Sequence, residues 1–218
     1  WHRLKRGVER NMAKRVFDVL LSSIGLLLLM PLLGLIALVV KLDSAGPVMF
    51  RQERVGRFGR TFRIHKFRTM RHVVSIDSAA AGQANPGLQI TVGADHRITR
   101  VGHFLRAAKL DELPQLLDVW LGDMSLVGPR PEVPRYVAHY PAALREKVLS
   151  VRPGITDIAS IEYRDESSVL ARAADPEQAY IHEVLPHKLA LAAQYVDQSS
   201  LWLDVRLIAR TVLAIVGR

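Results

Sequence analysis

The sequence predicts an α+β fold that is mainly helical and is attached to a membrane near its N-terminus. Three features predict it: one long uncharged segment, two short strand-like segments separated by glycines, and helix-like patterns over much of the remainder. The chain has 218 residues, of which 49% are hydrophobic. That content is enough for a sizeable core and is atypical of a disordered chain.

The charge of the chain indicates the kind of partner that it binds. Lysine and arginine outnumber aspartate and glutamate by 30 to 21, which gives a formal net charge of +9. This balance favours a polyanionic partner, such as nucleic acid, an anionic membrane surface or a phosphorylated substrate. The chain has no cysteine, which excludes disulfides and cysteine-based metal sites.

The uncharged segment runs for 22 residues from Val19 to Val40. As a helix it would measure about 33 Å, enough to cross the apolar core of a bilayer. A cleaved signal peptide fits poorly, because no small-residue cleavage site ends the segment. A buried helix of a soluble domain is the alternative, but few such helices are apolar on all sides over this length.

Pro31 lies in the middle of this segment, and basic residues precede and follow the segment. Proline bends a helix, and Ser22 and Ser23 can soften the same stretch. The positive-inside rule would put both basic flanks on the cytoplasmic side, which one straight crossing cannot satisfy. These residues leave two interpretations open: a re-entrant helix that enters and leaves the same leaflet, or an ordinary kinked span.

A β-hairpin is predicted over about residues 47–70, where two mixed apolar and basic segments flank the turn "GRFGR". Its arms and turn are rich in cations, which would attract phosphate groups. A solvated basic edge is the plainer interpretation. The cations are Arg51, Arg54, Arg57, Arg60, Arg63, Lys66, Arg68 and Arg71.

A mobile loop that orders on substrate binding is predicted over about residues 72–96, which lack periodicity and are rich in small and polar residues. Helices are predicted over about residues 97–160. They cover Ile98–Leu110, a segment that begins at Asp111 with Pro114 in its first turn, and a segment from Val133 to a turn at Arg152–Gly154.

The last predicted element is an amphipathic helix over about residues 200–217. Two interpretations are open for it. It lies on the membrane, where Trp202 would suit the headgroup boundary, or it packs onto the core. The residues expected on its apolar face are Leu201, Val205, Ile208, Val212 and Ile215.

Asp111 and Glu112 form an acidic pair just ahead of a helix-like pattern. The plain explanation is a cap that suits the helix dipole. Three arginines in the flanking segments favour chemistry instead: Arg106, Arg130 and Arg152. Carboxylates without cysteine or clustered histidine suit Mg²⁺, which is commonly shared with substrate phosphates. A carboxylate that nearby cations keep ionised can also act as a nucleophile.

Five stretches carry a family resemblance: "KRVFDVLLSS" followed by Pro31, "GPVMFRQERVG", "FRIHKFRTM", "LRAAKLDELPQLLDVWLGDMSLVGPRPE" and "VRPGIT". Together they cover most of the chain from Lys14 to Ile155. In these stretches the chain resembles bacterial sugar transferases of the monotopic phosphoglycosyl transferase family. Members of that family start glycoconjugate assembly on polyprenol phosphate.

The resemblance implies that Asp111 attacks the β-phosphate of a UDP-sugar. UMP would leave, and the phosphosugar would stay on Asp111 until undecaprenyl (polyprenol) phosphate takes it. Glu112 would support this step or remove a proton, and Mg²⁺ would bind with Asp111 and the diphosphate. The residues implied to bind substrate phosphates are Lys66, Arg106, Arg130 and Arg152.

The resemblance also implies a location. Pro31 would be the break of a re-entrant, monotopic helix on the cytoplasmic face of the bacterial inner membrane, with anionic lipids as partners and homodimer formation left open. Residues 1–13 would be a basic lead-in or a vector remnant, 14–45 the re-entrant helix and 46–218 the cytoplasmic catalytic domain. No large additional domain is expected, as in a minimal catalytic form.

The chain departs from the family pattern after "RPGIT". Many relatives continue with glycine and a "WAQVNGR"-like stretch, whereas this chain reads "RPGITDIASIEYRDE" with Asp157 at the glycine position. This region is expected to shape recognition of the sugar or nucleotide. The identity of the sugar is therefore not carried over.

Two other classes compete with a transferase: a membrane-anchored nucleic-acid-binding protein and a non-enzymatic membrane scaffold. No known nucleic-acid-binding motif is present in the sequence, so no nucleic-acid partner is expected. Both classes predict that Asp111→Asn leaves function intact. The transferase class predicts near-complete loss of turnover.

Overall fold

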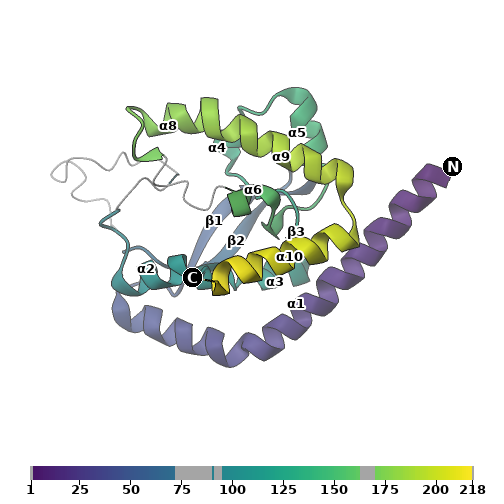
Figure 1. Cartoon of the computed structure of the whole chain (residues 1–218). Helices are drawn as coiled ribbons and strands as arrows, with labels where there is room; N and C mark the ends of the chain where they lie inside the picture. Colours follow the sequence, from purple (N-terminus) through teal and green to yellow (C-terminus); the bar gives the residue numbers. More distant parts are fainter. Residues whose placement is uncertain (1, 72–89, 91–94, 163–169, 218) are drawn as a thin grey trace.

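A computed structural model describes residues 2–71, 90, 95–162 and 170–217 (Figure 1). This part of the chain is mainly helical with small strand pairs, so the α+β, mainly helical class predicted from the sequence is confirmed. The elements are α1 (His2–Asp43), β1 (Met49–Val55), η1 (Arg57–Gly59), β2 (Thr61–Phe67), α2 (Arg100–Ala107), η2 (Leu110–Glu112), α3 (Gln115–Leu121), β3 (Ser125–Val127), α4 (Pro134–Val137), α5 (Ala142–Val148), β4 (Gly154–Thr156), α6 (Ile158–Glu162), α8 (Pro176–Ala179), η3 (Tyr180–Val184), α9 (Leu185–Gln198) and α10 (Leu201–Val216).

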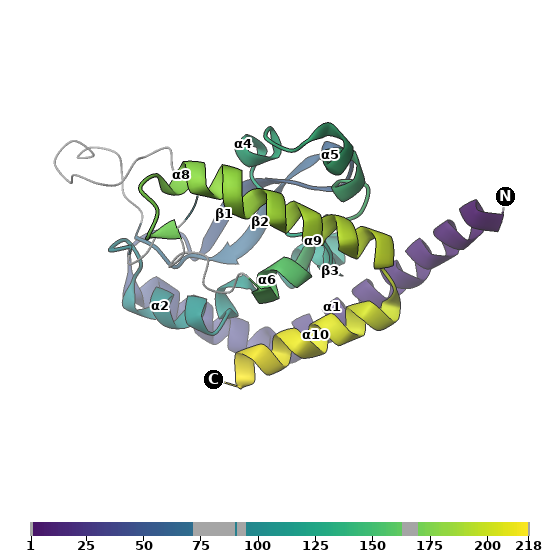
Figure 2. The ribbon, with the colours of Figure 1, turned by 45° about the horizontal axis from the view of Figure 1, so that its top comes forward.

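The elements form layers that both overall views show. In Figures 1 and 2, α1 and α10 lie on one side of the molecule, α8 and α9 lie on the opposite side, and the β1–β2 hairpin lies between them. The largest core cluster joins the hairpin end at Val55 to α4, α5 and α9, and its central side chains include Tyr136, Tyr180 and Leu189. The hairpin and the helices α4, α5 and α9 therefore share a core that is separate from the exposed face of α1.

Helix α1 contains the long apolar segment, and Pro31 lies inside it. The helix is continuous through the proline, so Pro31 does not interrupt it; Figure 1 shows a bend that gives two arms running in different directions. The region Met12–Asp43 is long and apolar enough to cross a membrane, and only 11% of its most apolar stretch is buried. Most of this apolar surface is left without protein cover.

The two arms of α1 contact the same folded body on either side of its bend. On the first arm, the Lys14 ammonium lies 2.6 Å from an Asp204 carboxylate oxygen on α10. On the second arm, Ile36 and Val40 pack with buried Phe67 of β2. The helix is thus held at two places, with an exposed apolar stretch between them.

The predicted hairpin is confirmed. Strands β1 and β2 are antiparallel, and Met49 pairs with Phe67 at the open end. The turn at η1 needs the left-handed conformation twice, at Phe58 (φ 60°) and Gly59 (φ 78°). Gly59 adopts this conformation without strain, whereas Gly56 is extended (φ −103°), so only the second glycine of "GRFGR" supplies the left-handed geometry.

The helix predicted over Ile98–Leu110 is present as the shorter α2, but the one expected to begin at Asp111 differs. Asp111 and Glu112 lie in the 3₁₀ turn η2, and α3 begins only after Pro114. The left-handed Lys109 (φ 57°) separates α2 from this turn. The predicted helix started too early, because Pro114 was expected in its first turn, whereas Pro114 lies just before the first residue of α3.

The segment after Val133 was also predicted as one helix, and this is wrong. It forms the short helices α4 and α5, because Pro141 precedes α5 and ends the hydrogen-bonding pattern of α4. The parallel strand pair β3–β4 was not predicted, since each strand has only three residues. In this pair Ser125 is aligned with Gly154.

Helix α10 confirms the predicted C-terminal helix. The buried side chains are Asp204 and Leu207, whereas Val205 and Val212, expected to share the apolar face, are exposed. The helix therefore packs on the core through the face that carries Asp204 and Leu207, and its apolar residues Val205 and Val212 stay exposed on a different face. The loop predicted over 72–96 lies almost entirely outside the described residues.

Candidate active site

The acidic pair lies in η2, between α2 and α3. Both side chains are buried, with exposed fractions of 1% for Asp111 and 7% for Glu112. The left-handed turn at Lys109 redirects the chain after α2, so the pair faces the folded body. Carboxylates are seldom buried without partners, so their neighbours decide what the site can do.

Lys66 lies between the two carboxylates. Its ammonium is 2.9 Å from an Asp111 oxygen and 3.2 Å from a Glu112 oxygen. Strand β2 supplies it, next to Phe67, which is buried against α1 and α2. One cation thus reduces the repulsion between two adjacent anions.

Both terminal nitrogens of Arg130 donate hydrogen bonds to the Glu112 carboxylate, Nη2 to Oε1 at 2.7 Å and Nη1 to Oε2 at 3.3 Å. The Arg130 amide N–H in turn donates to Asp157, at 3.2 Å. Asp157 therefore holds the turn that presents Arg130. This contact could not be predicted from the sequence, because it joins positions 27 residues apart.

The charges around Glu112 fix its protonation. Burial alone raises the pKa of this carboxyl, but the cations Arg130 and Lys66 outweigh it, so the pKa lies well below its usual range. Glu112 in turn raises the pKa of the Arg130 guanidinium. Burial lowers the pKa of nearby Lys109. Glu112 is therefore a stable anion that orients cations, and a poor proton acceptor.

Sequence reasoning missed a second pair beside the site. Asp118 on α3 accepts from the His65 amide N–H at 2.9 Å, and the His65 ring nitrogen Nδ1 lies 2.6 Å from the other Asp118 oxygen. His65 directly precedes Lys66. The pair therefore ties the strand that carries Lys66 to the helix that follows the acidic pair. The signal available was weak: Asp118 lies two helical turns beyond Asp111.

A cleft of about 780 Å³ adjoins the acidic pair through Lys66 and Arg130, which line it, whereas Asp111 and Glu112 do not. Its lining includes Lys66, Arg106, Gln115 and Arg130, together with arginines of the hairpin. This volume suits a nucleotide-sized ligand. Three of the four residues predicted to bind phosphate thus share one cleft.

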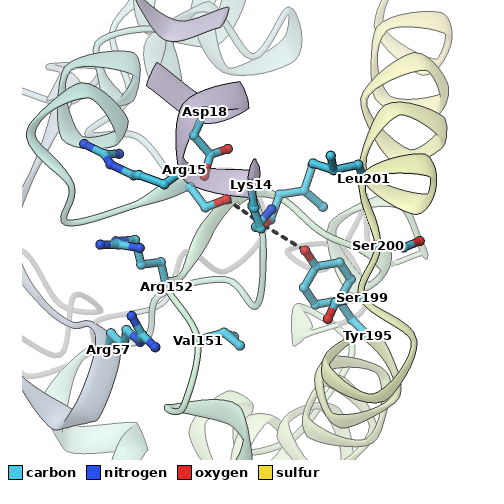
Figure 3. Close-up of a pocket in the computed structure, with 12 residues that line it drawn as sticks. Lys14, Arg15, Asp18, Arg57, Val151, Arg152, Tyr195, Ser199, Ser200 and Leu201 are labelled. Carbon is cyan, nitrogen blue, oxygen red and sulfur yellow. Dashed lines mark hydrogen bonds between the residues drawn. The ribbon is translucent and has the colours of Figure 1, made fainter. Parts of the chain in front are cut away.

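Arg152, the fourth predicted phosphate-binding residue, lies elsewhere. It lines a separate cavity of about 50 Å³ beside Lys14 and Arg57 (Figure 3). Its Nε donates to the Gly122 carbonyl at 2.8 Å. The structure therefore does not bring Arg152 together with the acidic pair.

The oxygens of Asp111 bear on metal binding. Oδ2 pairs with Lys66, but Oδ1 is buried and has no hydrogen-bond partner among the described residues. Those residues contain no group of three or more His, Asp or Glu side chains that could enclose a metal. A lone carboxylate with one uncommitted oxygen fits Mg²⁺ that is shared with substrate phosphates, and does not fit a metal held by protein alone.

Comparison with known proteins assigns the chain to a family. The family model for bacterial sugar transferases matches residues 9–218, and the chain belongs to that family. The family predicted from the motifs is thus confirmed, and the protein is a transferase.

Several curated relatives have names that state a reaction. The UDP-glucose:undecaprenyl-phosphate glucose-1-phosphate transferase of Caulobacter vibrioides is 39% identical over 94% of this chain and 70% of the relative. The Escherichia coli (strain K12) protein of the same name is 37% identical over 94% of this chain. A UDP-N-acetylgalactosamine-undecaprenyl-phosphate N-acetylgalactosaminephosphotransferase of Aeromonas hydrophila is 37% identical over 93% of it. The chain spans only 40% and 43% of the last two relatives.

Proposed function

We propose that this protein transfers a sugar phosphate from a UDP-sugar to undecaprenyl (polyprenol) phosphate, giving polyprenyl diphosphate sugar and UMP. The observation that carries the proposal is the buried Asp111, with one uncommitted oxygen, joined through Lys66 to a cleft lined by cations. The names of the relatives support both substrates. Those names differ in the sugar, so the proposal leaves the sugar open.

Asp111 acts as the nucleophile in this proposal. A carboxylate oxygen attacks the β-phosphorus, the bond from that phosphorus to the oxygen bridging the two phosphates breaks, and UMP leaves with the bonding electrons. An oxygen of polyprenol phosphate then attacks the same phosphorus and releases the Asp111 carboxylate. Two displacements at one phosphorus give a product with a new diphosphate and return the enzyme unchanged.

Lys66 and Glu112 prepare Asp111 for this attack. An anionic nucleophile approaches an anionic diphosphate only if their repulsion is cancelled, and Lys66 lies 2.9 Å from Asp111. Glu112, held ionised by Arg130, fixes the position of Lys66 from the other side. Arg106 and Arg130 line the cleft, where they would bind the diphosphate.

Mg²⁺ is proposed as the cofactor, held by Asp111 together with the substrate diphosphate. When bound, it would neutralise charge on the phosphate oxygens. Asp111 would then need to orient its two oxygens differently, one toward the metal and one toward phosphorus.

We further propose that α1 is re-entrant and that the protein is monotopic on the cytoplasmic face of the bacterial inner membrane. The two flanks of the apolar segment of α1 pack on the same folded body, through Lys14 and through Val40. A helix held this way cannot have its two ends on opposite sides of a bilayer. The exposed Trp202 and Leu213 of α10 would lie at the same surface.

The direct test measures UMP release from a panel of UDP-sugars with undecaprenyl phosphate and Mg²⁺. We expect release with one donor or a few, and loss of release with EDTA and in Asp111→Asn. A radiolabelled β-phosphate donor without acceptor should label the wild-type protein and not the variant. Turnover retained in Asp111→Asn would rule out the proposed mechanism.

A further inference from the structure

The small cavity around Arg152 has no role in the proposed reaction. It lies between the first arm of α1, the hairpin turn, the segment before β4, and the junction of α9 and α10 (Figure 3). Figure 3 shows Arg15, Arg152 and Arg57 gathered on one side of it, with Arg152 between the other two. At about 50 Å³ it has room for one small group and is far below the roughly 300 Å³ minimum of drug-sized pockets.

Two of these arginines are fixed in place by the C-terminal end of α3. Arg15 donates to the Val119 carbonyl at 2.6 Å, and the Arg152 Nε donates to the Gly122 carbonyl. Gly122 has a positive φ of 99°, and a Cβ there would lie 3.3 Å from an Arg15 nitrogen. Glycine thus serves both the turn and the close approach of the guanidinium. The arginines are held in place and are not mobile surface side chains.

Arg15 uses both of its terminal nitrogens, on the Val119 and Trp120 carbonyls, whereas Arg57 and Arg152 keep donors that no group of the described residues uses. Arg57 commits only its Nε, to the Ser150 carbonyl at 2.9 Å, and Arg152 likewise commits only its Nε. Within the described residues, the terminal nitrogens of both have no recorded acceptor, and neither arginine forms an ion pair with a carboxylate. Burial and the charge of Arg152 lower the pKa of the Arg57 guanidinium, as expected for cations that lack a counter-ion.

Nearby carboxylates do not supply that counter-ion. Asp18, which also lines the cavity, accepts from the Leu126 N–H at 3.1 Å. Lys14 is committed to Asp204. An anion from outside the chain would therefore complete the charge of this cavity.

The position of the cavity indicates the source of that anion. Arg15 lies one helical turn before the apolar segment that begins at Val19. Leu201 lines the cavity, and the exposed aromatic rings Trp120 and Trp202 belong to the adjoining helices α3 and α10. Tryptophan of this kind is typical of the headgroup layer of a membrane.

We propose that Arg15, Arg57 and Arg152 form a binding site for the phosphate of an anionic phospholipid, separate from the catalytic cleft. The site rests on the proposed membrane position of α1 and not on the proposed chemistry of Asp111. A bound headgroup phosphate would join α1, the hairpin turn and the β4 turn through one anion. It would thereby set the height and tilt of the catalytic part on the membrane.

The experiment titrates dihexanoyl phosphatidylglycerol, below its micelle-forming concentration, into the full chain in a neutral detergent, with calorimetric detection. Dihexanoyl phosphatidylcholine and inorganic phosphate are titrated in parallel. We expect saturable binding of phosphatidylglycerol that weakens about tenfold in Arg57→Gln and in Arg152→Gln, the scale of one lost charge-assisted hydrogen bond. Arg60→Gln makes the same charge change at an exposed site on the same hairpin turn, and it should bind within twofold of wild type.

The variants and the lipid and phosphate controls each have a decisive outcome. Unchanged binding in Arg57→Gln, which loses one bond to the Ser150 carbonyl and a contact with the exposed Phe58 ring, overturns the site even if Arg152→Gln fails to fold. Phosphatidylcholine binding as tightly as phosphatidylglycerol overturns the preference for an anionic lipid. Phosphate binding as tightly as phosphatidylglycerol overturns the lipid and leaves a free-anion site. Asp111→Asn should bind the lipid like wild type, so failure of the proposed chemistry and failure of this site are told apart.

Discussion

Two arginines in neighbouring turns of this protein have opposite electrostatic surroundings. Arg130 follows β3 and holds Glu112 with two nitrogens, whereas Arg152 precedes β4 and contacts only a backbone carbonyl. The backbones of the two turns almost touch, since a Cβ on Gly154 would lie 2.1 Å from the Gly128 nitrogen. Proximity of two arginine-proline motifs therefore does not mean that their side chains serve one site.

The difference separates two uses of positive charge. In the catalytic cleft, Lys66 and Arg130 are balanced by two buried carboxylates, so the site is assembled before any substrate arrives. In the small cavity the arginines have no carboxylate partner among the described residues, so an external anion is needed. The first arrangement suits chemistry on a transient substrate, and the second suits a resident anion.

The largest expected effect concerns the balanced cation of the cleft. Lys66→Gln removes the one group of the described residues that forms ion pairs with both carboxylates, and turnover should fall by about 100-fold or more, as when one preorganised donor to a reacting group is lost. Steady-state UMP release measures this. Arg60→Gln, with the same charge change on an exposed arginine, should stay near wild type. Equal turnover in the two variants would remove Lys66 from the catalytic centre.

Stability should distinguish the two arginines. Arg130→Met leaves Glu112 buried with only Lys66 as a partner, and we expect a loss of about 2–3 kcal/mol in unfolding free energy. This is below the cost for a fully buried pair, because 33% of the Arg130 side chain is exposed. Arg152→Met loses one bond to a carbonyl, at about 1 kcal/mol. Urea unfolding in a mild detergent compares the two variants. Equal losses of unfolding free energy would show that the carboxylate partner of Arg130 adds no more stability than the carbonyl partner of Arg152.

Local patterns were enough to predict much of the fold. The apolar segment of α1, the glycine turn of the hairpin and the helix-like spacing of α2 each act within a few residues, and all three elements are present. The β3–β4 pair and the break at Pro141 were missed, because three-residue strands and single-turn helices leave no periodic signal. The burial of Asp204 in α10 was not predicted, because this carboxylate is held by Lys14 and Tyr195, contacts that no helical pattern reveals.

The candidate site was predicted from motifs, with limits that have a physical cause. The structure brings together four of the predicted residues, because two cations pair with two carboxylates. These residues are Asp111, Glu112, Lys66 and Arg130. Arg152 was misplaced because its motif specifies a turn and not the direction of its side chain. Asp157 and the His65–Asp118 pair were missed since they act through contacts that are distant in sequence.

A weaker test of the cleft uses pH. The pKa of Glu112 is depressed in the folded state, so the unfolded chain binds the proton more readily and this carboxylate stabilises the fold above its unfolded pKa of about 4.3. That stabilisation is lost as pH falls below about 4.3 toward the lower folded pKa. Glu112→Gln should flatten this part of the stability curve while leaving the curve above pH 6 parallel to wild type. An unchanged acid slope in the variant would show that Arg130 and Lys66 do not hold the carboxyl ionised.

The smallest expected effect concerns α3, which connects the two regions. Its start adjoins the acidic pair, its end holds Arg15 and Arg152, and Asp118 in its middle accepts two bonds from His65. Asp118→Asn keeps the shape of the side chain but replaces one acceptor oxygen by a donor. We expect a loss of about 1 kcal/mol in unfolding free energy and a fall of a few-fold in turnover, since β2 would hold Lys66 less firmly.

Asp123→Asn is the matched control, because Asp123 is exposed and forms no side-chain hydrogen bond with the described residues. If the two variants behave alike, the His65–Asp118 pair does not position Lys66, and the cleft depends on the ion pairs alone.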